Sequence, residues 1–164
     1  MRNRGFALIE LVVVLVLIGV SAALVVPGFS RIAKSAELRT TAQKVSGLLR
    51  YYRNEAVQRG KVYQVLFDFN LREIRVQSVE VVPGNEQKEA TEEMRLRQRY
   101  PMPVDIQMKE MRTANPMYVS DYPVIEFYPN GSSNGGSFIL DLQNSRGFWI
   151  GINFLTGIVE VRSV

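Results

Sequence analysis

Residues 6–29 of the chain read FALIELVVVLVLIGVSAALVVPGF, an apolar run of 24 residues whose single charge is at Glu10. At about 1.5 Å per helical residue the run spans roughly 36 Å, which exceeds the hydrocarbon core of a bilayer at about 30 Å. A carboxylate in such a helix costs at least a few kcal/mol unless it has a partner. The run therefore predicts a membrane helix in which Glu10 has a partner and a function.

Residues on either side of this run bear on its orientation and processing. Arg2 and Arg4 precede it and place the N-terminus in the cytoplasm, although Arg31 and Lys34 on the far side oppose this orientation. A cleaved secretory signal is the competing interpretation, since Ser21-Ala22-Ala23 could serve a signal peptidase. The apolar part of such a signal usually covers only about 7–15 residues, so a membrane anchor is favoured.

The amino-acid composition excludes several classes of function. The chain has neither cysteine nor histidine, which excludes thiolate catalysis, disulfide stapling, zinc sites of the usual kind and serine–histidine triads. No acid pair or nucleophile constellation indicates an enzyme, and no cofactor or metal site is expected. Charge is polarised: residues 31–61 carry eight basic and two acidic residues, whereas residues 62–164 carry ten basic and thirteen acidic ones. The basic stripe is compatible with nucleic acid, anionic lipid or the acidic face of a neighbouring copy.

After Pro27-Gly28 the pattern becomes that of an amphipathic helix over residues 30–58. Apolar residues recur at alternating spacings of four and three and form one helical face: Leu38, Ala42, Val45, Leu49, Tyr52 and Ala56. Gly60 is a stop signal. We predict one helix of more than fifty residues, whose second half packs against a folded domain.

Beyond Gly60 the period changes to two, which is typical of strands. The predicted strands cover residues 63–69, 74–82, 124–128, 138–142, 148–153 and 158–161, with a hairpin turn near Asn70–Arg72 and another at Leu155-Thr156-Gly157. Residues 83–116 are rich in charge and proline and are predicted to be a long, partly irregular surface segment.

Several other features are weak candidates for sites. The glycine-rich Asn130–Gly136 lacks the Lys-Ser/Thr and the following helix of a phosphate loop, so a loop between strands is favoured. Four aspartates lack the dense alternating pattern of a calcium loop: Asp68, Asp105, Asp121 and Asp141. Phe148, Trp149 and Phe154 are expected mostly in the core, with Trp149 or Phe154 as a possible contact residue. Tyr51-Tyr52 with nearby arginines could stack on nucleic acid, but helix-to-sheet packing is favoured.

The N-terminal motif Gly5-Phe6-Ala7-Leu8-Ile9-Glu10, preceded by arginines and followed by an apolar helix, closely resembles the class III signal of type IV prepilins and pseudopilins. The resemblance implies cleavage after Gly5 by a prepilin peptidase, methylation of the new amine on Phe6, and assembly into a helical filament. Threonine is usual where this chain has Ala7. Physical chemistry fits the spacing, because an amine on Phe6 would lie four residues from Glu10 on the same helical face. The carboxylate can then pair with the amine of its own chain or with that of an adjacent subunit. In the second case the charge pair sets the axial register between the two subunits.

The rest of the chain resembles the H-type minor pseudopilins of type II secretion and the related minor pilins of type IV pili, on the segments 127–140 and 155–159. This implies an α+β pilin-like fold with a long N-terminal helix, apolar and transmembrane in its first half and amphipathic in its second, packed on an antiparallel β-sheet domain. The expected organisation is a leader at 1–5, a transmembrane and assembly helix at 6–29, an amphipathic helix at 30–60 and a β-rich periplasmic domain at 61–164.

Three functions remain open at this point. The leading hypothesis is a minor pseudopilin of the type II secretion pseudopilus, held in the bacterial inner membrane with its C-terminal domain in the periplasm until it assembles with other pseudopilins. The alternative is a minor pilin of a type IV pilus that contacts DNA during uptake, through the basic helix or through Arg95, Arg97 and Arg99. The third is a membrane-anchored periplasmic binding module that never assembles.

Overall fold

The computed structural model describes residues 8–79, 96–114, 120, 122–142 and 147–164, with the backbone alone described at 22–31, 96 and 97. A 52-residue helix, α1 (Leu8–Arg59), precedes eight strands. The strands are β1 (Val62–Asp68), β2 (Glu73–Val79), β3 (Leu96–Pro101), β4 (Gln107–Thr113), β5 (Val124–Phe127), β6 (Gly136–Asp141), β7 (Phe148–Ile152) and β8 (Val159–Ser163). The chain divides into two compact units, unit 1 (Met1–Ala36) and unit 2 (Glu37–Val164).

Within unit 2, α1 follows the predicted pattern. All six residues of the predicted apolar face are buried, from Leu49 and Ala56 at 0 % exposure to Val45 at 5 %. The helix ends at Arg59, and Gly60 takes a left-handed backbone with φ of 63°. Glycine adopts that conformation without the steric cost of a side chain, so it reverses the chain into β1. The long helix and its buried face are therefore confirmed.

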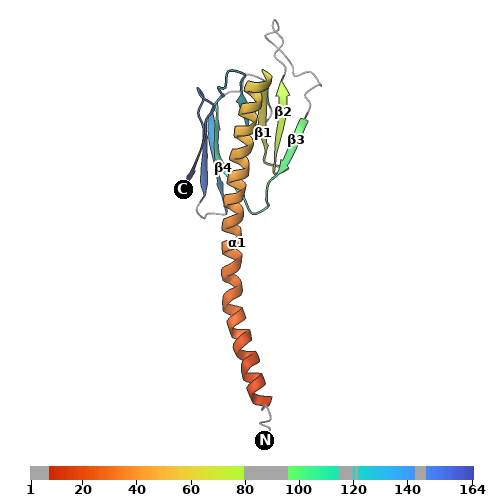
Figure 1. Cartoon of the computed structure of the whole chain (residues 1–164), viewed down its shortest axis with the longest axis vertical. Helices are drawn as coiled ribbons and strands as arrows, with labels where there is room; N and C mark the ends of the chain where they lie inside the picture. Colours follow the sequence, from red (N-terminus) through yellow and green to blue (C-terminus); the bar gives the residue numbers. More distant parts are fainter. Residues whose placement is uncertain (1–7, 80–95, 115–119, 121, 143–146) are drawn as a thin grey trace. The chain divides into compact units, whose positions relative to one another are not determined.

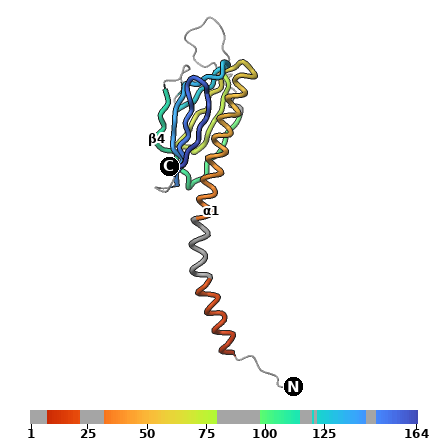
Figure 2. Tube along the Cα trace, turned by 60° about the vertical axis from the view of Figure 1, so that its left-hand side comes forward, coloured from red at the N-terminus to blue at the C-terminus, as the bar shows by residue number. Residues whose placement is uncertain are grey.

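The strands form two antiparallel sheets, ordered β3-β2-β1-β5 and β4-β6-β7-β8. In Figures 1 and 2 both sheets lie on the same side of the second half of α1. The core forms where both sheets meet this helix, and the rings of Phe67 in β1 and Phe138 in β6 pack with centroids 5.2 Å apart. Tyr52 of α1 packs on Tyr63 of β1 at 5.4 Å. The predicted α+β fold is confirmed, with the sheet domain divided into two sheets.

The prediction of irregular structure across residues 83–116 is wrong in part, because β3 and β4 lie within that segment. Both are edge strands of their sheets. An edge strand tolerates charges and proline, since one row of its backbone groups faces away from the sheet. Pro101 ends β3, and β4 carries an irregularity between Lys109 and Arg112 with Glu110 at a φ of 50°. The proline in β3 and the irregularity in β4 interrupt the alternation of apolar and polar residues, so the two strands could not be recognised from the sequence.

Candidate functional site

Glu10 lies in the first turn of α1, which begins at Leu8 in the described part of the chain. The other two predicted site residues, Gly5 and Phe6, lie outside the described residues. The processing site and the charge pair with Glu10 therefore stay predictions.

The helical surface around Glu10 is apolar on every side. Each large apolar side chain described between Leu8 and Val20 is exposed, with fractions from 44 % at Val14 to 80 % at Leu8. Such a surface is much larger than soluble monomers usually expose and marks a contact with protein or lipid. Within the described ranges, no helix meets the length and hydropathy criteria for crossing a membrane.

A second feature is a buried polar ladder on the face of the first sheet that points away from α1. Gln64 of β1 lies opposite Gln77 of β2 and Glu126 of β5. Gln77 Nε2 donates to Gln64 Oε1 at 2.7 Å, and Gln64 Nε2 donates to Glu126 Oε1 at 2.8 Å. The Tyr128 hydroxyl donates to the other carboxylate oxygen at 2.7 Å. The period of two placed Gln64 on a polar face, yet it is fully buried, as is Glu126.

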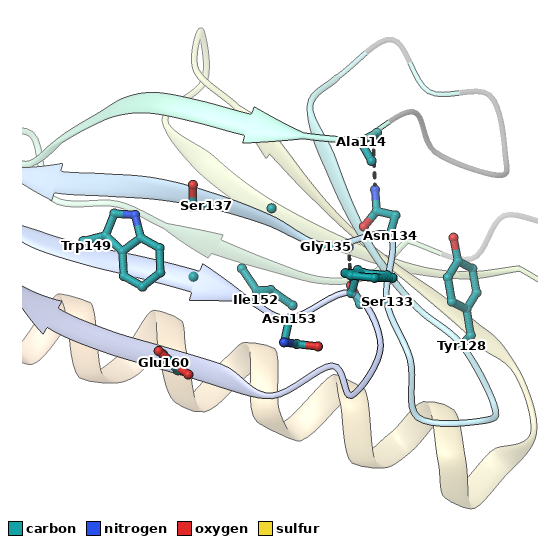
Figure 3. Close-up of a pocket in the computed structure, with 13 residues that line it drawn as sticks. Ala114, Tyr128, Ser133, Asn134, Gly135, Ser137, Trp149, Ile152, Asn153 and Glu160 are labelled. Atoms are coloured by element: carbon teal, nitrogen blue, oxygen red, sulfur yellow. Dashed lines mark hydrogen bonds between the residues drawn. The ribbon is translucent and has the colours of Figure 1, made fainter.

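A third feature is an open groove of about 930 Å³ over the outer face of the second sheet (Figure 3). Its walls come from Tyr128 after β5, residues 133–137 leading into β6, Trp149 and residues 151–154 of β7 and its turn, and Glu160 of β8. The Trp149 ring lies along the strand over Gly151, and the Arg162 guanidinium sits 5.3 Å from its centroid. Phe154 is 60 % exposed, so of its two predicted roles the core role is wrong and that of a possible contact residue stays open.

The glycine-rich loop is a connection between strands, as predicted, because β6 and no helix follows it. The turn is built from its own polar groups: Ser132 N donates to Asn130 Oδ1 at 3.0 Å, and Gly135 N donates to Ser133 Oγ at 3.1 Å. Asn134 then links the turn to β5, since Glu126 N donates to Asn134 Oδ1 at 2.9 Å. These backbone amides are used internally and are not arranged for a phosphate.

Two of the aspartates noted in the sequence, Asp68 and Asp141, serve different contacts. Asp68 Oδ1 accepts a hydrogen bond from Leu71 N at 2.9 Å. Its other oxygen forms an ion pair with Arg75 at 2.8 Å. Asp141 pairs with Lys109 at 2.7 Å. Asp121 lies outside the described residues, and in the described part no three acidic groups gather into a metal-binding cluster.

The structure describes some of the aromatic and arginine candidates for nucleic acid. Tyr52 is buried, and its hydroxyl donates to Gln98 Oε1 at 3.0 Å, so its role in packing is confirmed. Tyr51 is 54 % exposed and meets Tyr52 edge to face. Arg99 is exposed on β3, whereas Arg95 and the side chain of Arg97 lie outside the described residues.

Comparison with known families places these features in context. Residues 1–26 match the prokaryotic N-terminal methylation motif, the region that holds Gly5, Phe6 and Glu10. Residues 41–154, more than half of the chain, match the family described as type II transport protein GspH. The chain belongs to the GspH family. That match runs from Thr41 in α1 to Phe154 in the turn after β7.

Solved structures share the fold of this GspH-family chain. The minor pseudopilin EpsH from the type 2 secretion system of Vibrio cholerae is 12 % identical, with a TM-score of 0.57 over 77 % of this chain and 97 % of that one. The type IV minor pilin FimU of Pseudomonas aeruginosa is 14 % identical, with a TM-score of 0.53 over 76 % and 92 %. At these identities the likeness concerns the fold. No curated protein matches by sequence.

Proposed function

We propose that this GspH-family chain is a minor pseudopilin: a non-enzymatic structural subunit of the type II secretion pseudopilus, cleaved after Gly5 and methylated on Phe6 before assembly. The observation that carries the proposal is Glu10, the acid in the first turn of an apolar helical surface whose described side chains are all exposed in the single chain. A surface of that kind is completed by lipid before assembly and by other subunits afterwards. Type II secretion follows from the family, and FimU shares only the fold.

The chemistry of assembly follows from the position of Glu10. Cleavage after Gly5 creates a positive amine on Phe6 that is four residues away and on the same helical face. Between packed apolar helices an unpaired carboxylate is costly, so each subunit is driven to the axial position where Glu10 meets an amine. The charge pair thus sets register, while the apolar side chains supply contact area.

Two measurements test the proposal. The chain is co-produced with a prepilin peptidase, and its N-terminus is read by mass spectrometry. We expect loss of residues 1–5 and a methylated Phe6. Glu10→Gln is expected to be processed normally but to enter pseudopili several-fold less than the parent chain, scored by recovery in sheared filament fractions.

A conservative control separates charge from size. Glu10→Asp keeps the carboxylate and should retain more incorporation than Glu10→Gln. A chain that stays at full length with an active peptidase would contradict the proposed function, and normal incorporation of Glu10→Gln would contradict charge pairing alone. Salt-sensitive DNA binding by the processed chain would favour the type IV pilin alternative.

A further inference from the structure

The groove over the outer face of the second sheet has a floor of small residues between aromatic side chains. Ser137 of β6 lies opposite Gly151 of β7, and residues 135–136 extend this floor to the start of β6. Figure 3 shows Trp149 and Tyr128 at opposite ends of the groove. Because the floor carries only glycine and serine, a ligand can lie flat on the sheet between the two rings.

The aromatic side chains of the groove are held in place by the chain itself. The hydroxyl of Tyr128 donates to the buried carboxylate of Glu126 at 2.7 Å. Ser133 N donates to the carbonyl of Phe154 at 2.9 Å, which fixes the turn that carries this exposed ring. Trp149 lies over a glycine of its own strand. Surfaces that are ordered in advance lose little entropy on binding.

The polar groups of the groove carry no excess of positive charge. Glu160 is the only charged side chain among the described residues that line the groove, and Arg162 pairs with the Oε2 atom of Glu160 at 2.6 Å. A nucleic acid or another polymer of phosphates requires a basic surface, so this groove is not suited to one.

Hydrogen-bonding groups beside the aromatic rings remain available to a ligand. Asn153 Oδ1 accepts two backbone bonds inside the turn after β7, whereas the Nδ2 atom of Asn153 donates to no other group in the described part of the chain. The Oε1 atom of Glu160 can accept a bond, since the pair with Arg162 uses Oε2. The guanidinium of Arg162, 5.3 Å from the centroid of Trp149, places N–H donors next to that ring.

An extended peptide does not fit the floor of the groove. Peptides that bind to sheets usually add a strand at a free edge, where main-chain groups are unpaired. The floor lies on β6 and β7, and each of these strands is paired on both sides, β6 with β4 and β7, and β7 with β6 and β8. The main-chain groups beneath the groove are therefore already used within the sheet.

A pyranose ring whose hydroxyls are equatorial matches the groups that the groove offers. Its C–H groups form flat apolar faces that stack on aromatic rings, while its hydroxyls lie around the rim and bond to amides, carboxylates and guanidinium groups. A pocket for a single small molecule usually buries about 70–90 % of the ligand surface, which an open groove cannot do. A chain of sugars that contacts both ends of the groove is therefore favoured over a single sugar.

We propose that the groove binds a neutral, linear glycan whose pyranose units are joined by equatorial β-linkages. One unit stacks on Trp149 with its hydroxyls facing Glu160 and Arg162, and a second lies toward Phe154 and bonds to Asn153. An equatorially linked chain is extended and flat, as is the floor of the groove. All five residues follow β5, so binding does not depend on the N-terminal processing site.

Binding is tested on the full-length chain in a zwitterionic detergent without a sugar headgroup, because a sugar headgroup would compete. Cellohexaose and chitohexaose are linear and β-linked, and they differ in the acetamido group of chitohexaose; maltohexaose is α-linked and curved. Trp149 is the only tryptophan, so its fluorescence reports on the groove. We expect a saturable shift of the emission to shorter wavelength with a β-linked hexamer and several-fold weaker binding of maltohexaose. The tighter of the two β-linked hexamers shows whether the acetamido group is recognised.

Variants of exposed aromatic residues locate the binding. Phe154→Ala should weaken binding several-fold without changing the melting temperature, since this ring is 60 % exposed. Phe69→Ala is the matched control, because Phe69 is 47 % exposed on the turn between β1 and β2, outside the groove, and its loss should leave the affinity unchanged. Trp149→Phe keeps a smaller ring and should bind more weakly than the parent chain but more tightly than Trp149→Ala. Calorimetry measures the last two, which lack the fluorophore.

Several outcomes would overturn the glycan proposal. These are the absence of saturable binding by either β-linked hexamer, equal affinity for maltohexaose, and equal effects of Phe154→Ala and Phe69→Ala. Binding of unfolded casein peptides that is lost in Phe154→Ala, without binding of the hexamers, would overturn it as well and assign the groove to an extended peptide.

Discussion

The indole of Trp149 lies so closely over Gly151 that a Cβ at position 151 would be 2.0 Å from the Cη2 atom of the ring. Both residues belong to β7, two positions apart and therefore on the same face of the sheet. The missing side chain lets the ring lie along the strand and form part of the groove shown in Figure 3. The shape of the groove thus depends on one glycine.

Gly151→Val should lift the ring from the sheet. Overpacking of this kind costs about 1–3 kcal/mol of the free energy of unfolding. Because Trp149 is the only tryptophan, its fluorescence emission should move to longer wavelength as the ring enters water. In the Trp149→Ala background the same valine should cost less, since the clash is gone, and an equal cost in both backgrounds would refute the stacking.

Gly47→Ala should have the opposite effect on stability. Gly47 lies on the exposed side of α1, and a Cβ there would meet nothing within 4 Å. Alanine in an exposed helix interior is favoured over glycine by about 0.5–1 kcal/mol, so the urea midpoint should rise by a corresponding amount. A fall in the midpoint would mean that the helix is not continuous at this position.

The helix could be predicted from sequence because its signal is local and repeated. The apolar face from Leu38 to Ala56 follows the helical period over five turns, and Gly60 ends it. Strand β1 follows from the period of two over residues 63–69, and the apolar segments between turns correspond to β2 and to β5 to β8. In contrast, β3 and β4 are polar edge strands interrupted by proline or a bulge, and their pairing partners lie far away in sequence.

The groove and the polar ladder could not be predicted, because both depend on contacts between distant segments. Gln64 and Glu126 are 62 residues apart, and only the pairing of β1 with β5 makes them neighbours. The alternation of residues 63–69 indicates only that Gln64 lies on the polar face of its strand. Glu10, in contrast, could be identified from the sequence because it is the only charged residue in a uniform apolar run. Recognising it requires no knowledge of the tertiary structure.

Glu126→Leu should destabilise unit 2 because it leaves the buried amide of Gln64 without a hydrogen-bond acceptor. Gln64 Nε2 would lose its acceptor while fully buried, and such an unsatisfied donor costs about 1–3 kcal/mol. Glu126→Gln keeps an acceptor oxygen of the same shape and should cost less. Chemical unfolding measures both, and Glu160→Leu, at an exposed carboxylate, is the control expected to change stability by less than about 1 kcal/mol. Equal effects of all three variants would contradict a role for the ladder in stability.

The free energy of unfolding should fall at high pH because the Tyr52 hydroxyl ionises more readily in the unfolded chain than in the folded one. Burial away from water, followed by the hydrogen bond with Tyr100, raises the pKa of the Tyr52 hydroxyl well above its usual value. The unfolded chain loses this proton near pH 10, whereas the folded chain retains it. The stabilisation is therefore complete below about pH 10 and is lost as the pH rises towards the folded pKa.

Tyr52→Phe removes this titration, so the free energy of unfolding should decline less steeply above pH 10 than in the parent chain. Contributions from the other tyrosines and from lysines cancel when the two slopes are subtracted. At pH 7 the variant should already be less stable by about 0.5–1.5 kcal/mol, because Gln98 loses a hydrogen-bond donor. Identical slopes in the two chains, measured by urea unfolding from pH 8 to pH 11, would show that the Tyr52 hydroxyl ionises as readily in the folded chain as in the unfolded one.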